Sequence, residues 1–132
     1  GLAALLKSGR VRKVICSFPR QSDSHIFDAL YRGGKVELEL VPQGNLAERI
    51  RAAGAGIGGF FTATGYGTPV GEGKEVREFN GRPYILEEAI TGDFGIVKAW
   101  KADRYGNAIY RHTAQNFNPV AATAGRITVR EV

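Results

Sequence analysis

The chain contains no methionine and only one cysteine, Cys16, among its 132 residues. A single cysteine cannot form a disulfide within the chain, which fits a reducing compartment, so we expect a cytoplasmic protein. Cys16 lies in the segment Val11 to Ser17, whose pattern predicts a mostly buried strand, and it is predicted to be a buried structural thiol. Because the chain begins at Gly1 and has no methionine anywhere, we expect a fragment of a longer protein.

Long apolar runs are also absent. None approaches the roughly 18 residues that a membrane span requires, and no targeting segment is recognisable. Hydrophobic residues make up 43% of the chain and charged residues 23%, close to the average of soluble domains. We therefore expect one domain over residues 1–132, with no membrane partner.

The chain has no cluster of residues at the spacing of metal ligands. His25 and His112 lie far apart without matching cysteine or carboxylate partners, so no metal site is predicted. Glu87 and Glu88 are adjacent in an expected strand, where neighbouring side chains point to opposite faces. We therefore expect two solvated carboxylates there rather than an acid/base pair.

Acidic residues are missing from the first 20 positions, and the net charge of the chain is +5. The basic residues in that segment are Lys7, Arg10, Arg12, Lys13 and Arg20. One hypothesis is therefore a non-catalytic module whose basic face binds nucleic acid or another protein. The cations are not interleaved with aromatic residues, however, so a solvated face is the simpler interpretation and no nucleic-acid partner is expected.

The most informative stretch runs from Val36 to Thr68. It starts with alternating apolar and acidic residues, VELEL, which predict a strand that ends before Pro42. Asn45 and Glu48 have the spacing of a capping box and predict the start of a helix. Apolar residues at helical spacing follow at Leu46, Ile50 and Ala53. Gln43 is therefore expected at a strand-to-helix turn, where open α/β sheets bind their ligands.

A glycine-rich segment, GAGIGGFFTATGYGT, follows this helix from Gly54 to Thr68. A dinucleotide fingerprint would have its glycines before a helix, whereas these glycines come after one. The segment is predicted to be a long loop. Both a pocket wall and a plain flexible connector are open interpretations, because long loops with glycines and aromatics serve either purpose.

Alternation of strand and helix patterns predicts the fold class. We expect an α/β fold with an open, mostly parallel sheet and flanking helices, extended by a hairpin-rich region. Asn80-Gly81, between two short strand patterns, is a strong hairpin signal. The expected helices are Leu2 to Gly9, Asp23 to Arg32 and Val120 to Gly125; further strands are Val76 to Phe79, Pro83 to Leu86, Phe94 to Trp100, Ala108 to Arg111 and Ile127 to Val132.

Three segments are characteristic of a known family: Glu39 to Thr68, REFNG at Arg77 to Gly81, and LEEAITGDFGIVKAWKAD at Leu86 to Asp103. They closely resemble the alpha subunit of two-subunit 3-oxoacid CoA-transferases and the N-terminal half of the single-chain succinyl-CoA enzyme. The resemblance extends over nearly all of the chain and implies a CoA-transferase/NagB-like fold. SFPRQ at Ser17 to Gln21 is most similar to subunits that act on 3-oxoadipate, whereas LEEAITGDF is closer to acetoacetate enzymes.

The resemblance implies transfer of CoA from succinyl-CoA to a 3-oxoacid. In the family, a glutamate in a Ser-Glu-Asn-Gly motif of the beta component attacks the thioester and passes through a glutamyl-CoA intermediate. That motif is absent here, so a beta subunit is the implied partner in a hetero-oligomer. CoA is then a substrate, and no separate cofactor is implied. The family's upstream glycine-rich signature and asparagine pair are also absent from this chain.

The resemblance also assigns site residues. Gln43 matches a family glutamine that hydrogen-bonds the reacting glutamate and the acyl oxygen, although it could instead only tie down its own turn. The expected substrate-binding residues are Gly44, Phe18, Arg20, Tyr66, Gly67 and Asn116. Arg20 is a candidate for the distal carboxylate of a dicarboxylic acyl group. Where the family commonly has an arginine before Asn116, this chain has Gln115.

Overall fold

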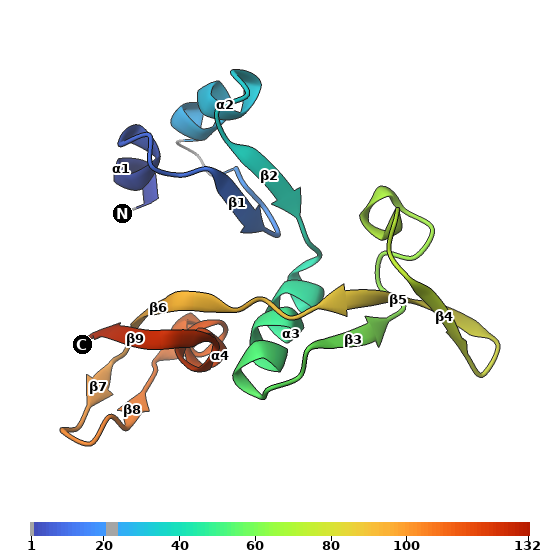
Figure 1. Ribbon diagram of the computed structural model, residues 1–132. Coiled ribbons are helices and arrows are strands. Elements are labelled where there is room, and N and C mark those ends of the chain that lie inside the picture. Colours follow the sequence, from blue (N-terminus) through green and yellow to red (C-terminus); the bar gives the residue numbers. More distant parts are fainter. Residues whose placement is uncertain (1, 21–23) are drawn as a thin grey trace. The chain divides into compact units, whose positions relative to one another are not determined.

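The computed structural model describes residues 2–20 and 24–132 (Figure 1). The chain divides into two compact units, Gly1–Leu46 and Ala47–Val132. That residues 1–132 form a single domain of the kind found in the alpha subunit stays a prediction.

The first unit contains a parallel strand pair with two helices. Its elements are α1 (Leu2–Lys7), β1 (Lys13–Cys16), α2 (His25–Arg32) and β2 (Glu37–Leu40). Strand β1 pairs with β2 in parallel, from Lys13 opposite Glu37 to Cys16 opposite Leu40. Leu6, Phe27 and Val36 are buried and form its core, and the partly buried Ile26 and Leu30 pack against it. Asp23, the expected first residue of the second helix, lies outside the described residues.

Helix α3 (Gln43–Gly54) begins in the first unit and continues in the second. The prediction that Asn45 caps this helix is wrong. The N–H of Leu46 donates to the Pro42 carbonyl at 2.9 Å, so the helical hydrogen bonds begin at Pro42 and Asn45 is already in the first turn. Asn45 is buried there, and Glu48 pairs with Arg51 instead of reaching back to the cap.

The second unit contains a three-stranded antiparallel sheet in the order β3-β5-β4. Its strands are β3 (Gly59–Thr62), β4 (Val76–Phe79) and β5 (Arg82–Glu88). The predicted Asn80-Gly81 hairpin is confirmed: both residues have positive φ, 51° and 76°, as a two-residue type I′ turn requires.

The expectation of one continuous loop from Gly54 to Thr68 is wrong in its middle, where β3 pairs with β5. Phe60, Phe61 and Thr62 have high β propensity, which offsets the surrounding glycines. Gly59 is required for sheet packing, because a Cβ at this position would lie 2.9 Å from the carbonyl oxygen of Glu87. The loop therefore starts only after Thr62.

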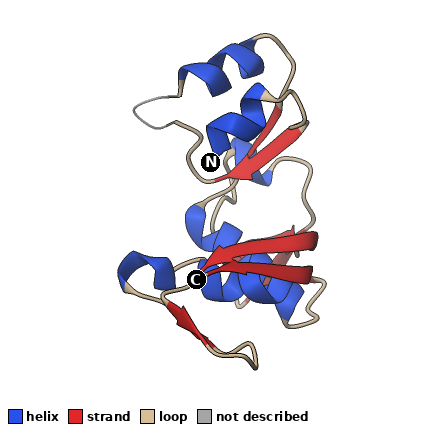
Figure 2. Cartoon of the chain, turned by 90° about the vertical axis from the view of Figure 1, so that its left-hand side faces the viewer, coloured by secondary structure: helices blue, strands red, loops and turns tan. Residues whose placement is uncertain are grey.

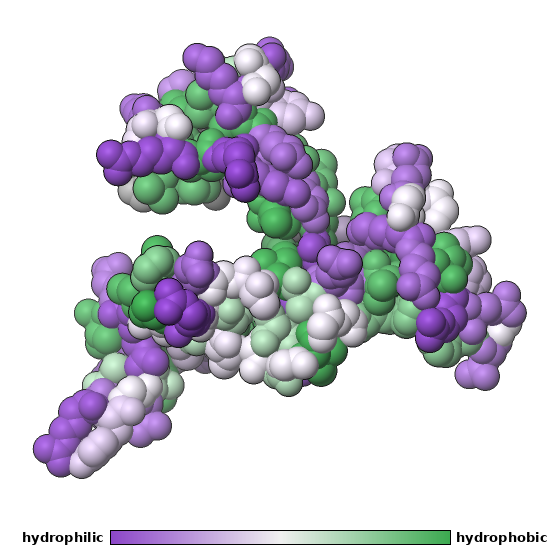
Figure 3. Space-filling view, viewed as in Figure 1, coloured by the Kyte–Doolittle hydropathy of each residue, from purple (hydrophilic) through white to green (hydrophobic). Residues whose placement is uncertain are grey.

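A second parallel pair, β6 (Gly92–Lys98) with β9 (Gly125–Glu131), follows in the same unit. Helix α4 (Asn118–Ala124) packs on β6, where a Cβ at Gly95 would lie 2.6 Å from the carbonyl oxygen of Ala121. Figure 2 shows β6 and β9 as two adjacent red arrows beside the C-terminus. The short hairpin of β7 (Lys101–Ala102) and β8 (Ala108–Ile109) lies between β6 and α4 in the sequence. Its tip is mainly hydrophilic (Figure 3). The chain thus has the expected α/β class, with helices and hairpins. Its described strands form two parallel pairs, the antiparallel sheet β3-β5-β4 and the antiparallel β7–β8 pair, rather than one open sheet.

Candidate functional site

The carboxyl ends of β1 and β2 form the edge at which the sequence places the reaction. Cys16 and Leu40 are paired across this edge, and the N–H of Val41 donates to the Cys16 carbonyl at 3.0 Å. Because both strands run in the same direction, the segments that follow them, with Phe18 and Gln43, leave the sheet at the same edge.

Gln43 and Gly44 form the first turn of α3 and are both exposed. The N–H groups of a helix's first turn have no partners within the helix, and they favour a negatively charged group nearby. The side chain of Gln43 adds an uncharged amide donor to this turn. This end of β2 therefore offers several donors for an oxygen that carries negative charge.

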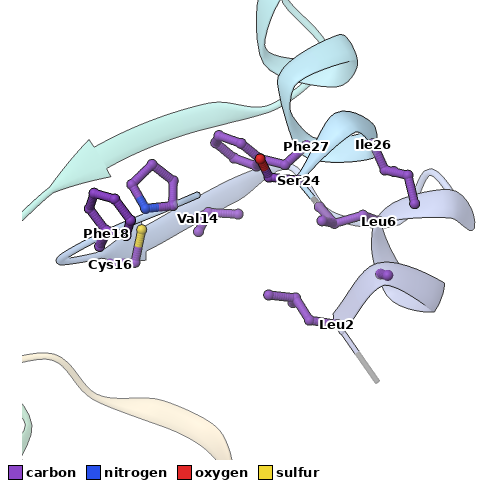
Figure 4. A pocket seen from close by; sticks show the side chains of 10 residues that line it. Leu2, Leu6, Val14, Cys16, Phe18, Ser24, Ile26 and Phe27 are labelled. Atoms are coloured by element: carbon purple, nitrogen blue, oxygen red, sulfur yellow. The ribbon is translucent and has the colours of Figure 1, made fainter. Parts of the chain in front are cut away.

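Phe18 and its neighbours line an apolar cavity of about 150 Å³ (Figure 4). The cavity lies between β1 and the two helices, with Leu6, Ile26 and Phe27 on its walls. Phe18 is 75% exposed. Cys16 also lines the cavity and is half-buried rather than fully buried as predicted, because the cavity leaves its side chain partly open. The partial burial raises the pKa of the Cys16 thiol.

Arg20 lies on the segment after β1 and is not free. Its Nε is 3.5 Å from Oδ1 of Asp28 on α2. The guanidinium nevertheless remains largely exposed, so its other nitrogens can reach a second carboxylate.

Tyr66 and Gly67 lie in the second unit, on the loop between β3 and β4. Gly67 has φ of 73°, a conformation that favours glycine, and Tyr66 is 49% exposed. Both residues line a surface hollow of about 240 Å³ together with Thr68, Pro69, Gly71, Glu72 and Val76. The loop thus shapes a concave surface. Its role in binding substrate stays a prediction.

Asn116 is exposed and follows a 3-10 turn, His112–Gln115. Its backbone N–H donates to the Thr113 carbonyl at 3.1 Å. Asn118 has the structural role in this motif: its Oδ1 accepts the N–H of Lys98 and its Nδ2 donates to the Ala114 carbonyl. Asn116 does not line the hollow that contains Tyr66.

A buried ionic cluster surrounds Glu87, and the sequence patterns did not indicate it. The expectation of a solvated carboxylate is wrong, since Glu87 is only 1% exposed. Its Oε1 lies 2.5 Å from Nζ of Lys74 and its Oε2 lies 3.6 Å from Nε of Arg49. The available signal was the strand alternation, because Glu87 shares a face with the buried Ile85.

Within residues 2–20 and 24–132, no group of three or more His, Cys, Asp or Glu side chains is placed to hold a metal ion. No helix in this described part of the chain is long and apolar enough to cross a membrane.

The fold is that of an α/β domain found in CoA-transferases. Glutaconate CoA-transferase from Acidaminococcus fermentans superposes with a TM-score of 0.77 at 16% identity, over 98% of this chain and 51% of that chain. An acyl-CoA transferase from Escherichia coli O157:H7 gives a TM-score of 0.76 at 22% identity, over 100% of this chain and 32% of that chain. Residues 1–132 match the family model described as Coenzyme A transferase, and the chain belongs to this family.

Curated relatives agree with this assignment. The chain is 62% identical over its whole length to the A-type subunit of 3-oxoadipate CoA-transferase from Pseudomonas putida, covering 57% of that protein. It is 57% identical over 99% of its length to the A-type subunit of a probable succinyl-CoA:3-ketoacid coenzyme A transferase from Bacillus subtilis, covering 54% of that protein. The chain therefore spans a little over half the length of these relatives, and the family resemblance of the sequence is confirmed.

Proposed function

We propose that this chain is part of the alpha component of an enzyme that transfers CoA from succinyl-CoA to a 3-oxoacid. The observation that carries the proposal is the exposed turn of Gln43 and Gly44 at the carboxyl end of β2, in a chain that matches the family over its whole length. The names of the relatives, which are A-type subunits of 3-oxoadipate and succinyl-CoA:3-ketoacid transferases, support the same reaction.

The reacting carboxylate comes from the partner beta component in this proposal. It attacks the thioester carbonyl and displaces the CoA thiolate. The thiolate then attacks the glutamyl carbonyl of the resulting mixed anhydride, which releases succinate and leaves a glutamyl-CoA thioester. The carboxylate of the 3-oxoacid attacks this thioester, and the same two steps in reverse form its CoA ester and free the glutamate. The amide of Gln43 donates a hydrogen bond to the carbonyl oxygen as it gains negative charge. An uncharged donor is suited to this step because it stabilises the oxyanion without taking up or releasing a proton.

The remaining predicted residues bind the substrate. Gly44 has no side chain and leaves the first turn of α3 accessible. Phe18 and Arg20, which follow the carboxyl end of β1, contact the acyl group. Tyr66 and Gly67 contact acyl-CoA from the loop after β3, and Asn116 contributes a further polar group. The acceptor is 3-oxoadipate or acetoacetate; CoA is a substrate and no separate cofactor takes part. We further propose a hetero-oligomer with the beta component, working in the cytoplasm.

The test is an assay of the full-length alpha component assembled with its beta component. We expect formation of 3-oxoadipyl-CoA or acetoacetyl-CoA from succinyl-CoA, measured by the absorbance of the product thioester. The ratio of kcat/KM for the two acids identifies the acceptor. Absence of transfer to either acid by an intact assembly would overturn the proposal.

A further inference from the structure

Glu87 is a buried carboxylate to which the proposed reaction assigns no role. It lies on β5 with 1% of its surface exposed, and each of its oxygens faces a different cation. Lys74 Nζ is 2.5 Å from Oε1, and Arg49 Nε is 3.6 Å from Oε2. Arg49 also donates from Nε to the backbone carbonyl of Glu88 at 2.7 Å and is itself 11% exposed. A carboxylate buried away from water is destabilised unless nearby cations compensate its charge, so Glu87 requires Lys74 and Arg49.

The three residues come from three different elements. Arg49 is on α3, Glu87 is on β5, and Lys74 directly follows the loop of residues 63–73, which begins after β3. The cluster therefore joins the loop, the sheet and the helix at a single carboxylate. Of the two ion pairs, Lys74–Glu87 is the one that attaches the C-terminal end of the loop to the sheet.

The loop itself is held by internal contacts. Thr68 Oγ1 donates to the Gly65 carbonyl at 2.8 Å and accepts the N–H of Val70 at 3.3 Å. Gly65 and Gly71 pack closely: a Cβ on Gly71 would lie 2.8 Å from the Gly65 carbonyl and 3.4 Å from Ile85. A self-packed loop of this kind moves as one body, so its position depends on the few contacts that attach it to the sheet. Ile85 and the Lys74–Glu87 pair supply such contacts.

We propose that Arg49, Glu87 and Lys74 form a latch that fixes the loop of residues 63–73, and that Lys74 and Glu87 are positioning residues for acyl-CoA. The part that concerns acyl-CoA rests on the proposed function. The latch holds Tyr66 and Gly67 in the hollow that they line, so the substrate meets a preformed surface. Binding to a preformed surface avoids the cost of ordering the loop, which places the effect of the latch on KM rather than on the chemical step.

The experiment compares variants of the full-length alpha component assembled with its beta component. Lys74→Met removes one cation while Arg49 still faces Glu87, and Lys74→Arg restores a cation. Arg51→Gln is the matched control, because it breaks the Glu48–Arg51 pair of 2.6 Å, which is exposed on α3 and attaches no loop. Hydrogen exchange of the backbone amides of residues 63–73 measures whether the latch holds the loop. The KM for succinyl-CoA, from steady-state kinetics, measures whether the loop positions the substrate.

We expect Lys74→Met to increase amide exchange in the loop and the KM for succinyl-CoA by about tenfold each, while kcat changes less than about threefold. Lys74→Arg should return both values to near those of the unchanged enzyme, and Arg51→Gln should alter neither. Unchanged loop exchange in Lys74→Met would overturn the latch. Faster exchange with an unchanged KM would overturn the positioning role alone. If the unchanged enzyme transfers no CoA while Lys74→Met still increases amide exchange in the loop, the proposed function is refuted and the latch is supported.

Discussion

Gln43 is the residue on which the proposed chemistry depends most. Its amide is exposed in the first turn of α3, and the backbone there is held by the Leu46 N–H to Pro42 carbonyl bond rather than by the amide. A donor aimed at developing charge stabilises the transition state more than the ground state. The side chain can therefore be removed without removing the turn.

Gln43→Ala should lower turnover of the assembled enzyme roughly a hundred- to a thousandfold, as losing one donor costs about 3 kcal/mol in comparable oxyanion sites. Alanine is a good helix former, so the melting temperature and the association with the beta component should stay the same. Arg51→Gln, which changes an exposed side chain on the same helix, is the control and should leave turnover unchanged. Near-normal turnover of Gln43→Ala would mean that this residue only shapes its turn.

Arg20 is the residue proposed to recognise a second carboxylate on the substrate. Its guanidinium is largely exposed although it pairs with Asp28. Arg20→Ala should raise the apparent KM for 3-oxoadipate about tenfold and change that for acetoacetate much less, since a hydrogen bond to a charged group is lost only with the dicarboxylic acid. Arg20→Lys should recover part of the affinity, because it keeps the charge but loses the fork of donors. Equal effects on both acids would indicate a structural role.

At the level of elements, the β7–β8 hairpin depends on one carboxylate. Oδ1 of Asp103 accepts the backbone N–H groups of Tyr105 and Asn107, both at 2.9 Å, and Oδ2 accepts the Asn107 side-chain amide at 2.7 Å. The Asn107 side chain and these backbone N–H groups lower the pKa of Asp103 below 3.8. Two-residue strands supply little stability of their own, so the turn organises the hairpin.

The expected pH dependence follows from that lowered pKa. The carboxylate stabilises the folded turn at pH values above 3.8, the ordinary value, and the stabilisation is lost as the pH falls through the lower pKa of the folded state. The amide proton signal of Asn107 in an NMR titration should therefore shift at a pH below 3.8. In Asp103→Asn this titration should disappear. A midpoint at or above 3.8 would contradict the hydrogen bonds to the carboxylate.

At the scale of the whole molecule, the chain lacks the Ser-Glu-Asn-Gly motif whose glutamate reacts in the proposed mechanism, and it spans 57% of the Pseudomonas putida relative. The 132-residue chain alone should therefore show no CoA transfer from succinyl-CoA to either acid. Turnover should appear when a full-length alpha component is combined with the beta component. It should not appear when the 132-residue chain takes the place of the alpha component. Turnover by the isolated chain would refute the division of the site between components. Binding of DNA with a steep salt dependence would support the basic-module hypothesis instead.

Local patterns in the sequence were sufficient to predict most of the secondary structure. The alternation around Glu37 to Leu40, the Asn80-Gly81 turn and the helical spacing of Leu46 and Ile50 each depend on a few neighbouring residues. The same segments carried the family resemblance, and with it Gln43 as the candidate donor. Steric limits on φ and the periods of helix and strand act within such short segments, which is why the sequence alone was informative there.

The partners of individual side chains depend on the folded chain. Strand alternation placed Glu87 and Glu88 on opposite faces, but it did not reveal that the Glu87 face is covered or that Lys74 and Arg49 meet there. Strand β3 was missed because its glycine-rich context disfavours a strand, and only pairing with β5 supplies the hydrogen bonds that stabilise it. Burial and strand pairing depend on residues that are distant in the sequence. The free energy of these contacts exceeds the secondary-structure propensity of the local segment. The pairing of Cys16 with Leu40, which brings Phe18 and Gln43 to the same strand edge, was likewise established by the tertiary fold.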